Sequence, residues 1–93
     1  GSQIVATAAG VVTFAGYTSG GYGNLVEIDH GNGFVTRYGH NSAVLVTVGM
    51  SVKQGQTIAL MGSTGKSTGA HVHYEVRLNN TPVDPMIFLP ISN

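Results

Sequence analysis

Two histidines stand two residues apart in the run His71-Val72-His73-Tyr74-Glu75, whose β-branched and aromatic residues are typical of a strand. Successive strand side chains point to opposite faces, so His71, His73 and Glu75 share one face, and the apolar residues between them form the natural core face. The two imidazoles would start about 6.5–7 Å apart at the backbone and could converge on one centre, such as a zinc ion. The same spacing also fits two half-exposed histidines beside a surface glutamate, because a catalytic zinc site needs a third protein ligand.

The other two histidines lie in different settings. His40 follows Tyr38-Gly39 at the end of a predicted strand, where a chain about to turn can direct a side chain into a groove. Taken alone, a histidine in this setting is more often an ordinary loop histidine. His30 lies at a hairpin tip, in Asp29-His30-Gly31-Asn32-Gly33, where polar turn-forming residues are expected. We therefore predict a structural role for His30 and expect Asp29 to cap the turn.

The segment Gly62-Ser63-Thr64-Gly65-Lys66-Ser67 ends like a phosphate-binding loop. That motif needs a glycine where Leu60 stands, and it must open a helix, whereas a predicted strand follows here. The match therefore fails. We interpret the segment as a loop beside the groove, where backbone amides and hydroxyls could hold an extended peptide, although a plain hairpin loop fits as well.

Short β-branched runs separated by glycine-containing turns make up the chain. Strands are predicted over residues 4–5, 11–14, 24–29, 34–38, 44–46, 57–61 and 71–77. We expect the first two to pair around Gly10, and the third and fourth to form a hairpin whose Asn32-Gly33 turn supplies positive φ angles. No apolar 3.6-residue period lasts three turns. The prediction is one all-β domain over residues 1–93, a compact antiparallel barrel or sandwich.

Composition excludes several function classes. Four basic residues balance four acidic ones, so no basic stripe exists to neutralise phosphates, and nucleic-acid binding is not expected. No apolar run approaches the roughly 18 residues that span a bilayer. The absence of cysteine excludes disulfides and cysteine-bound metals.

Four motifs together resemble the lysostaphin/LytM-type zinc endopeptidases in order and spacing. They are Tyr38-Gly39-His40, Gly49-x-x-Val52-x-x-Gly55-Gln56-x-Ile58, the string from Gly62 through Ser67-Thr68-Gly69-Ala70-His71-Val72-His73-Tyr74-Glu75, and Asp84-Pro85. The resemblance covers nearly the whole chain. It implies a compact antiparallel β fold of the duplicated hybrid motif type with an open groove. It also implies hydrolysis of peptide bonds in peptidoglycan, in the bacterial cell envelope, either periplasmic or extracellular.

The resemblance also implies roles for individual residues. The family's zinc is held by an upstream histidine, an aspartate four residues later and the second histidine of His-x-His. Residue by residue, His73 would be the zinc ligand, His40 and His71 the catalytic histidines, and Glu75 a supporting residue. The groove that receives peptidoglycan peptides is expected to include five side chains: Tyr38, Ser63, Thr64, Ser67 and Thr68.

The upstream His-x-x-x-Asp pair has no counterpart here, because no histidine precedes His30 and no aspartate precedes Asp29. We therefore expect a domain truncated at its N-terminus, with little zinc binding or hydrolysis by this polypeptide. The working spacing of the other residues favours an active parent peptidase. The alternative is a degenerate cell-wall-binding or hydrolase-activator module of the same fold. A missing first strand would also leave an open sheet edge beside Ile4-Val5, which could pair with another chain.

A biotinyl or lipoyl carrier domain is a distant third hypothesis. Residues 48–56 resemble the half-barrel repeat of such domains. A carrier needs its modified lysine at a hairpin tip, normally flanked by methionine or a small acidic residue. Neither Lys53 nor Lys66 has such a setting.

Overall fold

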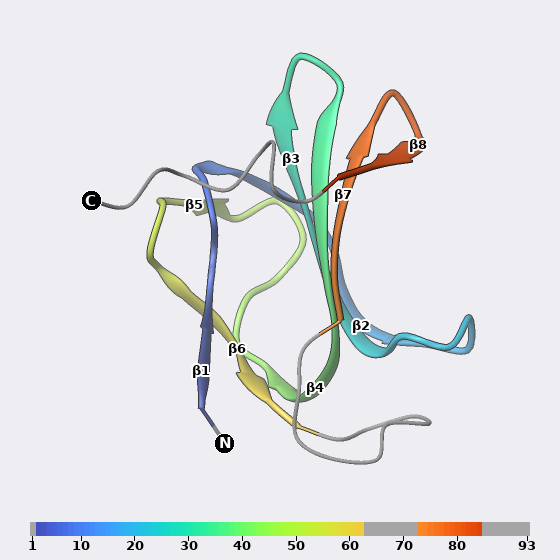
Figure 1. Ribbon diagram of the computed structural model, residues 1–93. Coiled ribbons are helices and arrows are strands. Elements are labelled where there is room, and N and C mark those ends of the chain that lie inside the picture. The colour runs from blue at the N-terminus through green and yellow to red at the C-terminus, as the bar shows by residue number, and fades with distance from the viewer. Residues whose placement is uncertain (1, 63–72, 85–93) are drawn as a thin grey trace.

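The computed structural model describes residues 2–62 and 73–84, which form eight strands (Figure 1). In chain order these are β1 (Gln3–Val5), β2 (Gly10–Thr18), β3 (Gly23–Gly31), β4 (Phe34–Val44), β5 (Ser51–Val52), β6 (Thr57–Met61), β7 (His73–Leu78) and β8 (Thr81–Val83). Every pairing is antiparallel, so the all-β antiparallel prediction is confirmed. Within the two described ranges, no helix is long and apolar enough to cross a membrane.

The sheet has the order β1-β6-β4-β3-β2-β5, and β7 and β8 branch from it beside β4. Strand β4 changes partner along its length. Residues 34–39 pair with β7, whereas residues 41–44 pair with β6. The sheet therefore divides at His40, and Figure 1 shows β7 running beside β4, with β1 and β6 on the other side of the molecule.

The sheet curls so that one face encloses the core. Ten buried residues form this core: Ile4, Ala6, Val12, Val26, Ile28, Tyr38, Val46, Val52, Ile58 and Ala59. On β7, Val76 is fully buried and Tyr74 packs against the core, whereas His73 is exposed on the opposite face. The predicted division of this strand into a core face and a histidine face is therefore confirmed for its described residues.

A chain of hydrogen bonds crosses the core from β3 to β7. The Thr36 hydroxyl lies 2.7 Å from His30 Nε2 and 2.9 Å from the Tyr38 hydroxyl. The Tyr38 hydroxyl lies 3.0 Å from Thr7 Oγ1, which in turn lies 3.0 Å from the Tyr74 hydroxyl. We call these five residues the core hydrogen-bond chain. It satisfies polar groups that would otherwise be costly to bury and ties β3, β4 and β7 together.

The predicted hairpin of β3 and β4 is confirmed. Asn32 and Gly33 take positive φ angles of 55° and 83°, as a two-residue turn of this kind requires. The Asp29 carboxylate accepts a hydrogen bond from the Gly31 amide at 2.8 Å, which confirms its capping role.

Two local predictions are wrong. Residues 4–5 do not pair with residues 11–14, because β1 pairs with β6 while β2 pairs with β3 and β5. Gly10 is the first residue of β2 and lies opposite Val52. The predicted strand over 44–46 is only the end of β4, which stops at Val44. Strand β1 ends the sheet order, but its association with another chain stays a prediction.

Candidate functional site

Strand β4 carries one extra residue at His40. Tyr38 lies opposite Val26 and Asn41 lies opposite Asn24, so three steps along β4 match two along β3. His40 itself takes a φ of 62°. A bulge of this kind redirects a side chain. Tyr38 and Asn41 both face the core, at 1% and 0% exposure, while His40 is partly exposed on the other face.

Hydrogen bonds hold this bulge in place. The side-chain amides of Asn24 and Asn41 each donate to the other residue's carbonyl, at 3.0 and 3.1 Å. Asn41 also donates to the Tyr38 carbonyl at 2.8 Å, and the His40 amide donates to the Tyr22 carbonyl at 2.6 Å. The predicted position of His40 at a strand end is therefore wrong, because β4 continues through the bulge to Val44.

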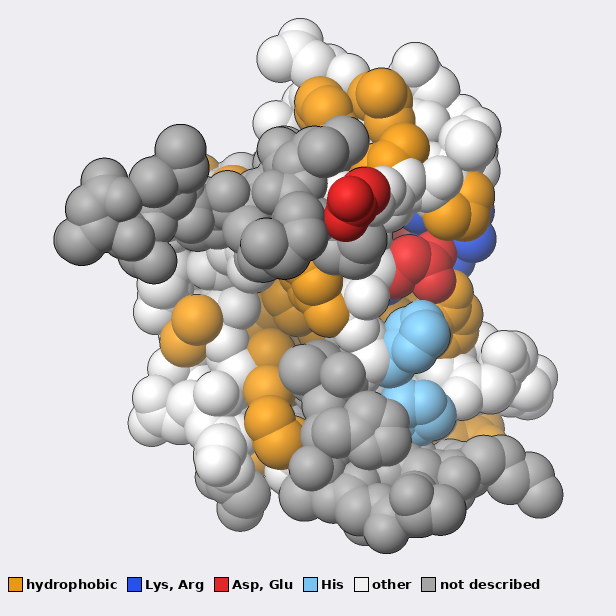
Figure 2. Space-filling view, in the orientation of Figure 1, with side chains coloured by type: hydrophobic (Ala, Val, Ile, Leu, Met, Phe, Trp, Pro, Cys, Tyr) orange, Lys and Arg blue, Asp and Glu red, His pale blue; other side chains and the backbone are white. Residues whose placement is uncertain are grey.

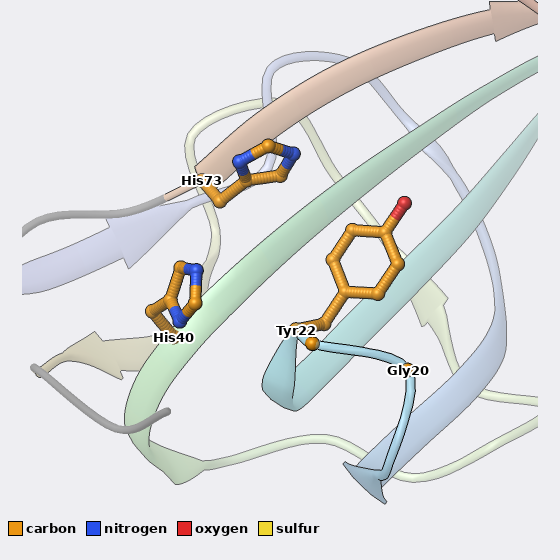
Figure 3. Close-up of a pocket in the computed structure, with 5 residues that line it drawn as sticks. Gly20, Tyr22, His40 and His73 are labelled. Carbon is orange, nitrogen blue, oxygen red and sulfur yellow. The ribbon is translucent and has the colours of Figure 1, made fainter. Parts of the chain in front are cut away.

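His73 begins β7 directly opposite Gly39, one residue before the bulge. Its side chain is 49% exposed. The His73 and His40 rings are nearly perpendicular, with their centroids 5.9 Å apart. The Tyr22 ring meets His73 edge-on from the other direction, with the centroids 5.4 Å apart. Figure 3 shows these three side chains gathered around one space.

That space is an open cavity of about 210 Å³ lined by Gly20, Gly21, Tyr22, His40 and His73. We call it the histidine pocket. Figure 2 shows histidine side chains together on the surface, next to acidic side chains and with basic ones behind them. The two glycines bring main-chain amide and carbonyl groups to one wall, where a peptide substrate could form hydrogen bonds.

A cluster of charged side chains lies beside the pocket on β3, β4 and β7. Arg37 pairs with Glu27 at 2.7 Å, and its guanidinium lies 3.9 Å from Glu75. Arg77 pairs with the same Glu75 oxygen. The other Glu75 oxygen accepts a hydrogen bond from the Tyr22 hydroxyl at 2.8 Å and lies 3.5 Å from His73 Nε2.

The pKa of Glu75 reflects these contacts. Burial alone would raise the pKa of this carboxyl, but hydrogen bonds from Tyr22 and Arg77 and the positive charge of Arg77 lower it below its ordinary value. Glu75 is therefore a carboxylate at neutral pH, and its negative charge faces His73. A carboxylate in this position orients the imidazole that faces it.

His30 forms hydrogen bonds with Ala9 and Thr36, neither of which lines this pocket. Its Nδ1 donates to the Ala9 carbonyl at 2.7 Å, and its Nε2 belongs to the core hydrogen-bond chain. Burial lowers the pKa of His30, although the Ala9 carbonyl and Asp29 oppose this effect. The neutral form is thus favoured, and the structural role predicted for His30 is confirmed.

The structure brings some of the expected site residues together and separates another from them. His40, His73 and Glu75 lie side by side. Tyr38 does not line the groove, because strand alternation turns it into the core, where its hydroxyl bonds with Thr7 and Thr36. The remaining expected residues lie outside the described part of the chain: Ser63, Thr64, Ser67, Thr68 and His71.

The described donors do not make a complete zinc site. Within residues 2–62 and 73–84, no three side chains of histidine, cysteine, aspartate or glutamate are placed to hold a metal ion. His40 and His73 are neighbours, but a catalytic zinc ion takes three protein ligands. The Glu75 carboxylate already interacts with the guanidinium groups of Arg37 and Arg77 and accepts a hydrogen bond from the Tyr22 hydroxyl. The described residues alone therefore do not fit the metal.

Sequence reasoning missed Tyr22 as a residue of the histidine pocket. It stands in Ser19-Gly20-Gly21-Tyr22-Gly23, between two strands, and no spacing rule links it to the histidines. The only available signal was an aromatic residue inside a run of glycines, where a flexible main chain lets a large ring fold back onto the sheet.

Comparisons with known proteins agree with this geometry. The family model described as Peptidase family M23 matches residues 1–85, which include both pocket histidines. The DD-carboxypeptidase/endopeptidase Mpg of Neisseria meningitidis serogroup B is 50% identical over 86 residues, which is 92% of this chain and 20% of that protein. The murein hydrolase activator NlpD of Escherichia coli is 44% identical over 90 residues, covering 97% of this chain and 24% of that protein.

Among solved structures, the catalytic domain of the antimicrobial peptidase lysostaphin from Staphylococcus simulans superposes with a TM-score of 0.88 at 36% identity, covering 95% of this chain and 70% of that one. The predicted fold is therefore confirmed at the level of a known architecture. The chain spans only about a fifth to a quarter of the two curated relatives named above.

Proposed function

Because the chain belongs to peptidase family M23, we propose that it is the core of a zinc-dependent endopeptidase domain that acts on peptide bonds of bacterial peptidoglycan. The site of action is the cell envelope, in the periplasm or outside the cell. In this proposal His73 is one zinc ligand, and the described residues do not supply the others. A zinc ion bound there would supply Lewis-acid polarisation of the scissile carbonyl and activation of a water molecule.

The observation that carries the proposal is the pairing of His40 with His73 at the histidine pocket, with ring centroids 5.9 Å apart. Imidazole gains and loses a proton near neutral pH, which suits general acid–base chemistry at an amide bond. The bulge fixes the main chain of His40, and its amide hydrogen bond to Tyr22 limits its movement. His40 is thus suited to move a proton to or from a peptide held against Gly20 and Gly21.

The test is hydrolysis of purified peptidoglycan, together with zinc stoichiometry, for the 93-residue chain and for the full product of its gene. We expect His40→Ala in the active form to lower kcat by about 10²–10⁴-fold, the usual contribution of a general acid or base. Tyr17→Ala provides the control, because Tyr17 is exposed and does not line the pocket. Undiminished hydrolysis by His40→Ala would refute the proposed role.

A second function has its own support. The similarity to a protein named as a murein hydrolase activator, at 44% identity, favours a domain that binds cell wall and stimulates another hydrolase. The incomplete metal site among the described residues agrees with this alternative. An activator would bind no stoichiometric zinc and would raise the rate of a purified murein hydrolase. Its activity would survive the change His40→Ala.

A further inference from the structure

We propose that Tyr22 is a positioning residue that fixes the separation of His40 and His73. The inference rests on the proposed function of the histidine pocket and adds a residue to it. Tyr22 contacts the two histidines through different groups, its main chain and its ring.

The main-chain contact acts on His40. The Tyr22 carbonyl accepts a hydrogen bond from the His40 amide at 2.6 Å. This amide belongs to the residue with the left-handed φ of 62°, so the bond holds the strained point of the bulge. The position of Tyr22 therefore determines where the main chain of His40 lies.

The ring contact acts on His73. Tyr22 precedes β3, and β7 lies two strands away beyond β4, yet the two rings meet edge-on with centroids 5.4 Å apart. The ring reaches β7 by passing over Gly39, the residue opposite His73. A Cβ at Gly39 would lie 3.0 Å from Tyr22 Cδ1 and 3.3 Å from the Tyr22 carbonyl oxygen. Glycine at this position thus leaves the space that the tyrosine occupies.

The hydroxyl fixes the direction of the ring. It donates to Glu75 at 2.8 Å and accepts from Arg37 at 3.2 Å, and the Arg37 guanidinium also lies 5.7 Å from the ring centroid. The Glu75 oxygen that accepts this bond is the one that lies 3.5 Å from His73 Nε2. Tyr22 therefore positions His73 in two ways. Its ring contacts the His73 ring, and its hydroxyl holds the Glu75 carboxylate that faces the His73 imidazole.

The consequence concerns the reacting geometry. If His40 moves a proton on a peptide bound beside His73, the separation of the two histidines decides whether His40 reaches that peptide, and a misplacement of about 1 Å can lower the rate roughly 10²-fold. A positioning role predicts a change in kcat with KM nearly constant, because the groups that reach the substrate are still present.

The experiment compares the imidazole resonances of His40 and His73 by NMR in the metal-free chain for the wild type, Tyr22→Phe and Tyr22→Ala. We expect Tyr22→Phe to shift the His73 resonances, since the hydroxyl bond to Glu75 is lost. Tyr22→Ala should shift both histidines and weaken the nuclear Overhauser effects between their rings. The controls Tyr17→Phe and Tyr17→Ala change a tyrosine that is 72% exposed and should leave both sets unchanged.

Activity provides the second measurement in whichever form of the protein hydrolyses peptidoglycan. Tyr22→Phe should lower kcat about tenfold and Tyr22→Ala about 10²-fold, with KM changed less than about twofold. Unshifted histidine resonances in both folded Tyr22 variants would overturn the inference. If the wild type neither hydrolyses nor binds peptidoglycan, the proposed function fails, while the NMR comparison still decides the role of Tyr22.

Discussion

Replacing Thr36 with valine tests whether the core hydrogen-bond chain stabilises the fold. Thr36 is fully buried, and its hydroxyl lies between His30 Nε2 and the Tyr38 hydroxyl, at 2.7 and 2.9 Å. Valine has nearly the same shape, so Thr36→Val removes hydrogen bonding without creating a cavity. The substitution also removes one hydrogen-bond partner from the buried Tyr38 hydroxyl and one from the partly buried His30 ring.

The number of hydrogen bonds lost gives the size of the expected loss of stability. Each hydrogen bond contributes about 1 kcal/mol net, and a buried group left without its partner costs about 1–3 kcal/mol. We therefore expect Thr36→Val to lower the free energy of unfolding by about 2–3 kcal/mol. For a domain of this size, each kcal/mol corresponds to about 4–8 °C, so Tm should fall by roughly 10–20 °C.

Urea unfolding followed by circular dichroism measures this difference. Thr13→Val is the matched control, because the Thr13 hydroxyl donates to Glu27 in an exposed setting at 2.9 Å. It should change stability by less than about 0.5 kcal/mol, as exposed substitutions usually do. If Thr36→Val were no more destabilising than Thr13→Val, the chain of hydrogen bonds would not stabilise the fold as argued.

Three further predictions concern stability. Burial lowers the pKa of His30, so the unfolded chain takes up a proton at a higher pH than the folded one does. The free energy of unfolding should therefore fall as the pH drops through about 6.5. In urea titrations between about pH 8 and 5, His30→Gln should make this pH dependence weaker. An equal pH dependence in the wild type and the variant would contradict the role given to His30. At the positive φ of 62°, His40→Val should cost about 1–3 kcal/mol more than His40→Asn in thermal unfolding, and equal losses would argue against strain there. A Cβ at Gly10 would lie 2.5 Å from the Asp29 carbonyl oxygen, so Gly10→Ala should cost about 1–3 kcal/mol. Gly20→Ala, whose Cβ would come no closer than 3.7 Å to another group, should be nearly neutral by the same measurement.

Much of the fold could be predicted from local pattern. Alternation and an Asn-Gly turn identified the hairpin of β3 and β4, where each residue's environment is decided by near neighbours. The pairing of β1 could not be predicted, because its three residues lie against β6 more than fifty positions along the chain. Strands β5 and β8, of two and three residues, are too short for any periodicity to appear.

The candidate site was predicted only in part, for physical reasons. The histidine face of β7 follows from the two-residue period of a strand. Tyr38 was assigned to the groove although the same period, applied to β4, turns its ring into the core. Tyr22 could not be found, because its contacts with β7 exist only once β3 and β4 are paired and Gly39 leaves room for the ring.

The extra residue in β4 has a consequence for engineering. The number of residues between Tyr38 and Asn41, more than their identity, determines which face of the sheet the side chain at position 40 points to. Plain alternation over the same four residues would turn the imidazole inward and the asparagine out to solvent, whereas the extra residue keeps Asn41 on the core side together with Tyr38. A designer who transplants this segment to another hairpin must therefore carry the whole four-residue step, with a partner for both asparagine amides.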